Sequence, residues 1–198
     1  MNKLRADYYQ QEDVCLIARD LLGKVIVSRQ GTRISSGIIV ETEAYSFLER
    51  GCHAYQNKRT PRTEVMFAPG GHAYVYLCYG MHHLFNVVTN KKDIAEAVLI
   101  RAIEPLEGID LMQQRRGNVK SKYLLSSGPA RLTKALGIDL KHNTIDLSGN
   151  QIWLEDRNIN YSPKELSATP RIGIDYAGAD AKKLWRFIVK SNEWLSKK

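Results

Sequence analysis

A β-branched run that leads directly into two acids and a tyrosine is the feature that most constrains this chain. Residues 38–40 (I-I-V) precede residues 41–45 (E-T-E-A-Y), so the segment is predicted to be a strand. Side chains alternate between the two faces of a strand, which places Glu41, Glu43 and Tyr45 on one face. Carboxylates are costly to bury unless they are paired. The row is therefore either a solvated face carrying ordinary charges or part of a cleft that needs a general base.

The rest of the sequence predicts a sheet whose neighbouring strands are joined by hairpins. Asp13 is expected to cap a helix that reaches Leu22 and ends at Gly23. Strands are expected at residues 24–28, 34–45, 72–77, 84–89 and 97–103, around Trp153, and at 171–174 and 185–189; helices are expected at 110–116 and 129–136. Short connections between strands favour antiparallel pairing. The pattern predicts one mixed domain, residues 1–198, with a mostly antiparallel sheet.

The second predicted hairpin has an aromatic tip. Its connection reads C-Y-G-M-H-H at residues 78–83, with Tyr79 beside the turn residue Gly80. Aromatic side chains at the end of a ribbon, flanked by basic surface, suit insertion between stacked bases in the minor groove. Core packing is an adequate explanation for Tyr74 and Tyr76 in the strand, but a tyrosine at a hairpin tip has little core to join.

The charge of the chain favours an anionic partner. Its formal net charge is +8 and its isoelectric point is near 9.4, which points to nucleic acid first and to an acidic membrane surface second. Residues 112–135 contain no acid and six basic side chains: Arg115, Arg116, Lys120, Lys122, Arg131 and Lys134. Solubility alone is the competing explanation for this basic cluster. No apolar run approaches the roughly 20 residues that span a bilayer, so no membrane partner is expected.

Cysteine and histidine do not predict a metal site. Three cysteines are too few for a disulfide framework or for an iron–sulfur cluster with four cysteine ligands. The histidines and cysteines also lack the spacing of a zinc site. We expect no cofactor and no metal. Without a signal peptide, the chain is expected to be intracellular: cytoplasmic and nucleoid-associated in a bacterium, or nuclear in a eukaryote.

These features together fit an enzyme that extracts a base from duplex DNA and hydrolyses its N-glycosidic bond. Two other functions remain open at this point. A non-catalytic protein that binds bent or damaged DNA would use the same basic surface and the same hairpin tip. A hydrolase of free nucleosides or glycosides would use Glu41 and Glu43 as an acid pair.

Eight motifs follow one another along nearly the whole chain. They are V-E-T-E-A-Y (40–45), R-T-P-R (59–62), M-F-A-P-G (66–70), Y-V-Y-L-C-Y-G-M (74–81) with Asn86, L-I-R-A-I-E-P-L-E-G (99–108), S-G-P-A-R-L (127–132), P-R-I-G-I (170–174) and W-R-F-I-V (185–189). In this order they resemble the motifs of the 3-methyladenine (alkyladenine) DNA glycosylases of the mammalian type. Residues 46–52 (S-F-L-E-R-G-C) depart from the family's pattern, so the resemblance does not predict their path.

The resemblance implies an α+β fold and a hydrolytic mechanism. The fold would be a single mixed domain on a curved, mostly antiparallel sheet, with flanking helices and a protruding β-hairpin. Glu43 would deprotonate the attacking water, and Arg101 and the backbone carbonyl of Ile172 would help to hold that water. The enzyme would be a monofunctional purine DNA glycosylase that acts, as a monomer, on double-stranded DNA containing damaged purines.

The resemblance also assigns the residues that hold the base. Tyr45, His53 and Tyr76 would line the pocket in which the flipped base stacks. Asn86 would disfavour normal guanine through a clash with its 2-amino group. Tyr79 would intercalate and fill the space that the flipped nucleotide leaves.

Overall fold

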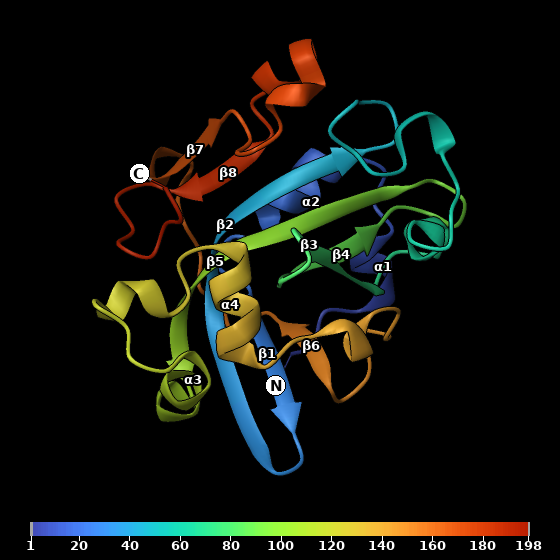
Figure 1. Ribbon diagram of the computed structural model, residues 1–198. Helices are drawn as coiled ribbons and strands as arrows, with labels where there is room; N and C mark the ends of the chain where they lie inside the picture. Colours follow the sequence, from blue (N-terminus) through green and yellow to red (C-terminus); the bar gives the residue numbers. More distant parts are fainter. Residues whose placement is uncertain (1, 198) are drawn as a thin grey trace.

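The computed structural model describes residues 2–197, and its core is a single antiparallel sheet (Figure 1). The strands are β1 (Val25–Gln30), β2 (Arg33–Ser46), β3 (Ala73–Cys78), β4 (His82–Thr89), β5 (Glu96–Glu107), β6 (Ile152–Glu155), β7 (Leu166–Thr169) and β8 (Arg186–Val189). Their order is β3-β4-β5-β2-β1-β6, and β8 pairs with both β2 and β7. All these pairs are antiparallel. The predicted α+β fold with a mostly antiparallel sheet is confirmed.

Short helices surround the sheet (Figure 1). They are α1 (Ala6–Tyr9), α2 (Val14–Asp20), α3 (Ile109–Arg116) and α4 (Pro129–Leu136), with the 3-10 turns η1 (Tyr55–Asn57), η2 (Glu64–Phe67), η3 (Lys122–Leu125), η4 (Leu140–His142), η5 (Pro163–Glu165) and η6 (Asp175–Lys182). Asp13 caps α2 as predicted, because its carboxylate accepts from the N–H groups of Cys15 and Leu16 at 2.8 and 3.1 Å. Gly137 closes α4 with a φ of 71°, a conformation that glycine adopts without strain.

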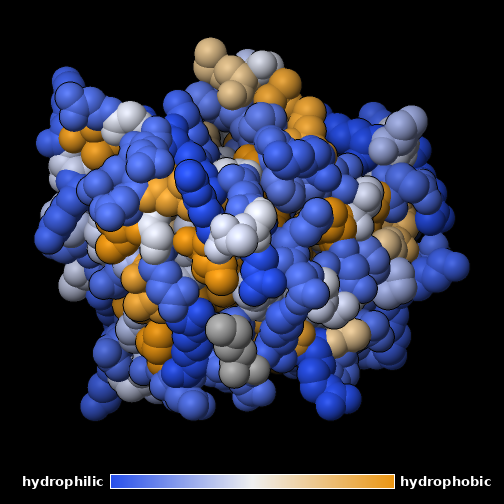
Figure 2. Space-filling view, turned by 90° about the horizontal axis from the view of Figure 1, so that it is seen from below, coloured by the Kyte–Doolittle hydropathy of each residue, from blue (hydrophilic) through white to orange (hydrophobic). Residues whose placement is uncertain are grey.

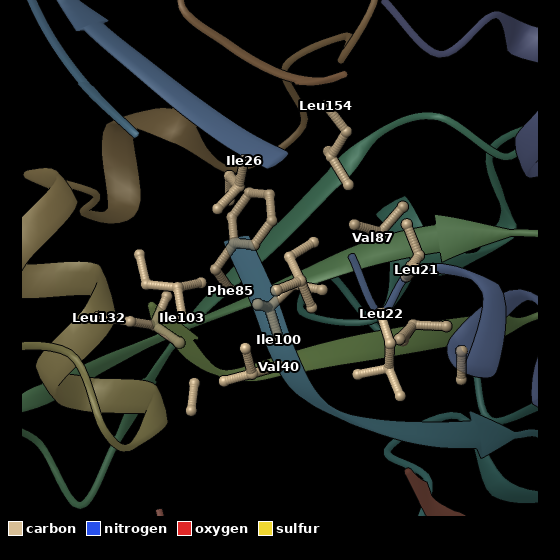
Figure 3. Close-up of a cluster of buried hydrophobic side chains, with 14 of the residues drawn as sticks. Leu21, Leu22, Ile26, Val40, Phe85, Val87, Ile100, Ile103, Leu132 and Leu154 are labelled. Atoms are coloured by element: carbon tan, nitrogen blue, oxygen red, sulfur yellow. The ribbon is translucent and has the colours of Figure 1, made fainter. Parts of the chain in front are cut away.

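The main hydrophobic core joins the centre of the sheet to α2 and α4 (Figure 3). Val40, Phe85 and Ile100 come from β2, β4 and β5, and they pack with Leu21, the C-cap residue of α2, and with Leu132 of α4. All five are inaccessible to solvent. Burying a side chain of this size stabilises a protein by about 1.5–3 kcal/mol. The two central strands of the sheet are thereby held firmly on one face.

Irregular pairing of β2 with β5 determines which side chains lie on the face opposite the main core. Ile39 is opposite Ile103 and Glu41 is opposite Ala102, so Val40 has no partner, and Arg101 is skipped in the same way on β5. Such bulges twist a sheet locally and redirect side chains. Val40 thus joins the core while Arg101 lies with the acids of β2 on the opposite face.

One predicted strand is wrong. Residues 171–174 form an irregular turn, and the strand that pairs with β8 is β7, earlier in the chain. The alternating apolar residues Ile172 and Ile174 suggested a strand, but Gly173 between them has a φ of 77°. That left-handed conformation bends the backbone out of an extended path.

The face of the molecule seen from below in Figure 2 is mostly hydrophilic, with apolar residues in small groups between charged and polar ones. The β1–β2 hairpin and α3 lie on this lower side in Figure 1. Exposed apolar residues scattered in this way are normal for a protein surface.

Candidate active site

A cavity of about 670 Å³ lies where β3, β4 and β5 meet the start of α4 and residues 172–176. Seven of the eight residues that the sequence singled out line it: Tyr45, His53, Tyr76, Tyr79, Asn86, Arg101 and Ile172. The eighth, Glu43, is fully buried behind this lining. Residues from distant parts of the chain thus come together at one place.

Three residues hold the Glu43 carboxylate. Its Oε1 accepts from the backbone N–H of Ile172 at 2.7 Å. Its Oε2 accepts from the Tyr45 hydroxyl at 2.8 Å and from Arg101 Nη1 at 3.2 Å. The resemblance assigned the carbonyl of Ile172 a role toward water, whereas the bond in the structure is made by its N–H. The carboxylate is fixed in orientation by donors from three separate segments.

The environment of Glu43 raises the pKa of its carboxyl above the ordinary value. Burial raises the pKa of the carboxyl, and Arg101, the Ile172 N–H and the Tyr45 hydroxyl act against this shift without reversing it. A carboxylate with a raised pKa is a stronger base than a solvated one. The structure therefore places a group suited to proton abstraction next to the cavity.

Glu41, the other acid of the row, is engaged in a different way. Its Oε1 accepts from Arg101 Nε at 3.1 Å, from Arg186 Nε at 2.7 Å and from the Ser196 hydroxyl at 2.7 Å. Its Oε2 accepts from the Ser196 N–H at 2.6 Å. Glu41 is fully buried, so these bonds balance a charge that would otherwise be costly. This carboxylate is tied to the arginines around it and has no bond to a cavity-side tyrosine like that of Glu43.

Aromatic rings and an imidazole form one wall of the cavity. The His53 ring contacts Tyr76 edge to face, with centroids 4.7 Å apart, and its Nδ1 is 2.8 Å from the Tyr74 hydroxyl. Arg62 lies over the Tyr76 ring, 4.8 Å from its centroid. Burial and then Arg62 lower the pKa of His53 to about 4. At neutral pH His53 is therefore uncharged and acts as part of an aromatic surface.

Asn86 lies deep in the same cavity. Its side chain is nearly fully buried, and its Nδ2 donates to the Tyr74 carbonyl at 3.0 Å. This bond fixes the amide, because an exchange of its nitrogen and oxygen would place two acceptors together. Asn86 is thus a rigid polar group on an otherwise aromatic wall.

The β3–β4 hairpin carries Tyr79 at its tip, as predicted. Tyr79 and Gly80 both have positive φ, 51° and 69°, as in a type I′ turn. The Tyr79 side chain is 88% exposed, and a bulky residue with positive φ is uncommon. A strained, exposed aromatic beside a cavity is the kind of feature found at functional sites.

Sequence reasoning missed the buried ion pair between Arg171 and Glu49. Arg171 Nη1 and Nη2 each lie 2.7 Å from a different Glu49 oxygen, and the guanidinium lies 4.8 Å from the Tyr45 ring centroid. Glu49 belongs to residues 46–52, whose path the motifs did not predict. The pair fixes the turn that presents the Ile172 N–H to Glu43. The one signal in the sequence was that Arg171 belongs to the motif P-R-I-G-I (170–174).

Within residues 2–197 there is no group of three or more His, Cys, Asp or Glu side chains that could hold a metal. Over the same range, no helix is long and apolar enough to cross a membrane. Burial raises the pKa of the Cys52 thiol, on the cavity wall, to about 12, so this thiol is protonated at neutral pH.

Comparison with known proteins places the chain among DNA glycosylases. The profile of the methylpurine-DNA glycosylase (MPG) family matches residues 7–193. The chain belongs to the methylpurine-DNA glycosylase family. This bears out the resemblance inferred from the motifs.

Bacterial relatives match the chain over nearly its full length. A protein of Carboxydothermus hydrogenoformans is 48% identical over 190 residues, which cover 96% of this chain and 97% of the relative. A protein of Clostridium acetobutylicum is 42% identical over 203 residues, covering 98% and 97%. A protein of Chlamydia felis is 44% identical over 188 residues, covering 94% and 95%. Each of the three bears the name "Putative 3-methyladenine DNA glycosylase".

Proposed function

We propose that this protein is a monofunctional DNA glycosylase that removes alkylated or deaminated purines from duplex DNA and leaves an abasic site. The observation that carries the proposal is the buried carboxylate of Glu43, fixed by three donors directly behind an aromatic cavity. Family membership gives the reaction class, and the geometry supports the roles proposed here for the residues.

Glu43 has the capacity to hold and activate one water. An ionised carboxylate offers about four lone-pair positions, and three of them accept from Ile172, Tyr45 and Arg101. The fourth is left for a water molecule. The water oxygen attacks C1′ of the sugar, Glu43 takes the proton, and the glycosidic bonding pair leaves with the purine. The carboxylate also stabilises the cationic sugar that develops as this bond breaks.

The cavity suits a flipped purine nucleotide. Its volume of about 670 Å³ is in the range of small-molecule sites. Tyr45, Tyr76 and the neutral His53 present aromatic surface, which attracts electron-poor, positively charged alkylpurines as aromatic cages attract cations. Asn86 is placed to disfavour the 2-amino group of normal guanine.

Tyr79 is placed to keep the base flipped. Flipping costs a few kcal/mol, less for a damaged or badly paired base. An exposed aromatic at a hairpin tip can fill the gap in the stack. The partner is then double-stranded DNA with a damaged purine, and a single chain supplies all of the residues required.

Two alternative functions are less well supported by the geometry. A hydrolase with an acid pair would need Glu41 free to act, but Glu41 is bonded to two arginines and to Ser196. A non-catalytic binder of damaged DNA would not need a carboxyl with a raised pKa at the cavity.

The test is release of the base from defined duplexes that each contain one lesion: 3-methyladenine, hypoxanthine or ethenoadenine. The wild-type protein is expected to release at least one of these bases by hydrolysis, without forming a covalent adduct that borohydride can trap. Tight binding of lesion DNA with no release of any of the three would support the non-catalytic alternative.

A further inference from the structure

Residues 194–197 fold back against the candidate active site. Leu195 is buried, and Trp194 packs edge to face on Tyr123, with ring centroids 5.2 Å apart. The Lys197 carbonyl accepts from Arg186 Nη2 at 2.6 Å. Ser196 and Lys197 line the same cavity as the aromatic residues. This segment is therefore anchored on both sides of Ser196.

Ser196 clamps the Glu41 carboxylate with two donors. Its N–H donates to Oε2 at 2.6 Å and its hydroxyl donates to Oε1 at 2.7 Å. The hydroxyl also lies 3.4 Å from Arg101 Nη2, from which it can accept. Hydrogen bonds to an ionised group are the stronger ones. A donor on each oxygen leaves the carboxylate one orientation.

The guanidinium of Arg101 links Glu41 to Glu43. Arg101 donates from Nε to Glu41 at 3.1 Å and from Nη1 to Glu43 at 3.2 Å. The guanidinium is planar and rigid, so a change in the position of Glu41 changes the bond at Glu43. The hydrogen bonds of Ser196 go to Glu41 and Arg101, so its influence on Glu43 passes through these two side chains.

We infer that Ser196 is a positioning residue, which holds Glu41 so that Arg101 is correctly oriented toward the catalytic carboxylate of Glu43. The inference rests on the proposed role of Glu43 as general base. It adds a residue that neither the motifs nor the cavity-lining aromatic groups assign to the reaction.

Loss of the Ser196 hydroxyl should change the pKa of Glu43 in a definite direction. Three charged groups face Glu43: Glu41 of the same strand, Arg101 of β5 and Arg171 of the turn that follows β7. The Tyr45 hydroxyl donates to Glu43, and Arg186 of β8 acts on it through Glu41. Without the hydroxyl, the negative charge of Glu41 is less balanced and Arg101 is less firmly held. Both effects disfavour ionised Glu43, so its pKa should rise further.

The first measurement is an NMR titration of the Glu43 carboxyl in the DNA-free protein. Ser196→Ala should raise the pKa of Glu43 by about 0.5, the size expected from losing one hydrogen bond in the network. Ser196→Thr, which keeps the hydroxyl, should restore the wild-type value. Ser148→Ala, an exposed serine outside the cavity lining, is the matched control and should leave the pKa unchanged.

The second measurement is the single-turnover rate of base release with saturating protein. Ser196→Ala should lower this rate about tenfold, a modest fraction of what a displaced catalytic group can cost, and move the ascending limb of the pH–rate profile to higher pH. Lesion-DNA affinity should stay near the wild-type value. If Ser196→Ala does not fold, Ser196→Cys, of similar size but with a weak donor, serves the same purpose.

The two measurements separate the inference from the proposed function. The titration needs no catalysis, so an unchanged pKa of Glu43 in both Ser196→Ala and Ser196→Cys would overturn the inference even if the enzyme proved inactive. Wild-type protein without base release would contradict the proposed function alone. A rate loss in Ser196→Ala that tracks only its unfolded fraction would show a purely structural role.

Discussion

The two acids of β2 are two residues apart, yet they have different surroundings. Glu43 contacts the turn at Ile172 and the phenol of Tyr45, whereas Glu41 is bonded to Arg101, Arg186 and the Ser196 backbone. Environment decides which of two neighbouring carboxylates can act as a base. At the residue scale, the two carboxylates differ in their partners, and Glu43 is the one beside the aromatic cavity that we propose as the base.

The pH dependence of base release should report Glu43. Because burial raises its pKa, the ionised base forms only as pH rises through that raised value. The rate should therefore climb with pH above the ordinary carboxyl value of 4.5. His53, with a pKa of about 4, is already neutral there. The measurement is single-turnover rate against pH, and a His53→Gln variant should keep the ascending limb in place.

Glu41→Gln should cost stability. It leaves two buried guanidinium groups without their shared carboxylate, and removing one partner of a buried ion pair typically costs about 3–5 kcal/mol. Urea denaturation measures this loss. Glu12→Gln is the control, since its ion pair with Lys91 is exposed and should add little stability. Wild-type stability in Glu41→Gln would show that the network around Ser196 is not needed by the fold.

At the scale of elements, the β3–β4 hairpin combines a buried base with an exposed tip. Phe85 of β4 is inaccessible to solvent, while Tyr79 is 88% exposed. The same hairpin thus contributes to the core, to the cavity wall through Tyr76 and to the surface through Tyr79.

Tyr79→Ala should separate insertion from packing. The melting temperature should be unchanged because no core cavity forms. Lesion binding should weaken by about 1–3 kcal/mol, the value of a stacked aromatic on single bases, and fluorescence of a base analogue beside the lesion should show less flipping. Phe85→Ala is the contrasting variant and should lose about 3–5 kcal/mol of stability. A large fall in melting temperature with normal flipping in Tyr79→Ala would contradict the wedge.

The sequence predicted these elements better than it predicted what joins them. Alternation in E-T-E-A-Y placed Glu41 and Glu43 on one face, and Tyr79 beside Gly80 marked the hairpin tip. The Glu49–Arg171 pair joins residues 122 positions apart, which no local pattern can show. The strand β7 (L-S-A-T) was missed because it is short and half polar, whereas the R-I-G-I turn mimics a strand.

The basic run of the sequence has a divided role in the whole molecule. Arg115 donates to the Ala135 carbonyl and to Ser35 and Gln30, and Arg116 donates to the carbonyls of Leu124 and Leu125. These two arginines hold α3 to its neighbours, so part of the basic run is engaged within the protein. Arg131 lies at the cavity, where its Nη1 donates to the Ser127 carbonyl at 2.9 Å.

DNA binding should depend strongly on salt. Log affinity should fall with log salt concentration at a slope of about −0.9 for each phosphate neutralised. Lys197→Ala removes an exposed cation at the cavity and should flatten this slope by about one. Lys164→Ala, an exposed lysine of η5 outside the cavity lining, should leave the slope unchanged. A salt-independent affinity would argue against DNA as the partner.

Glu43, in the proposed mechanism, activates the water that releases the damaged purine. The most direct test compares wild-type and Glu43→Gln on a duplex with one 3-methyladenine, measuring single-turnover release and lesion binding in the same samples. Glu43→Gln should lower release by about 10²–10⁴-fold and retain binding, because the cavity and Tyr79 are untouched. Near wild-type release by Glu43→Gln would contradict the account and move the search for the base to another group.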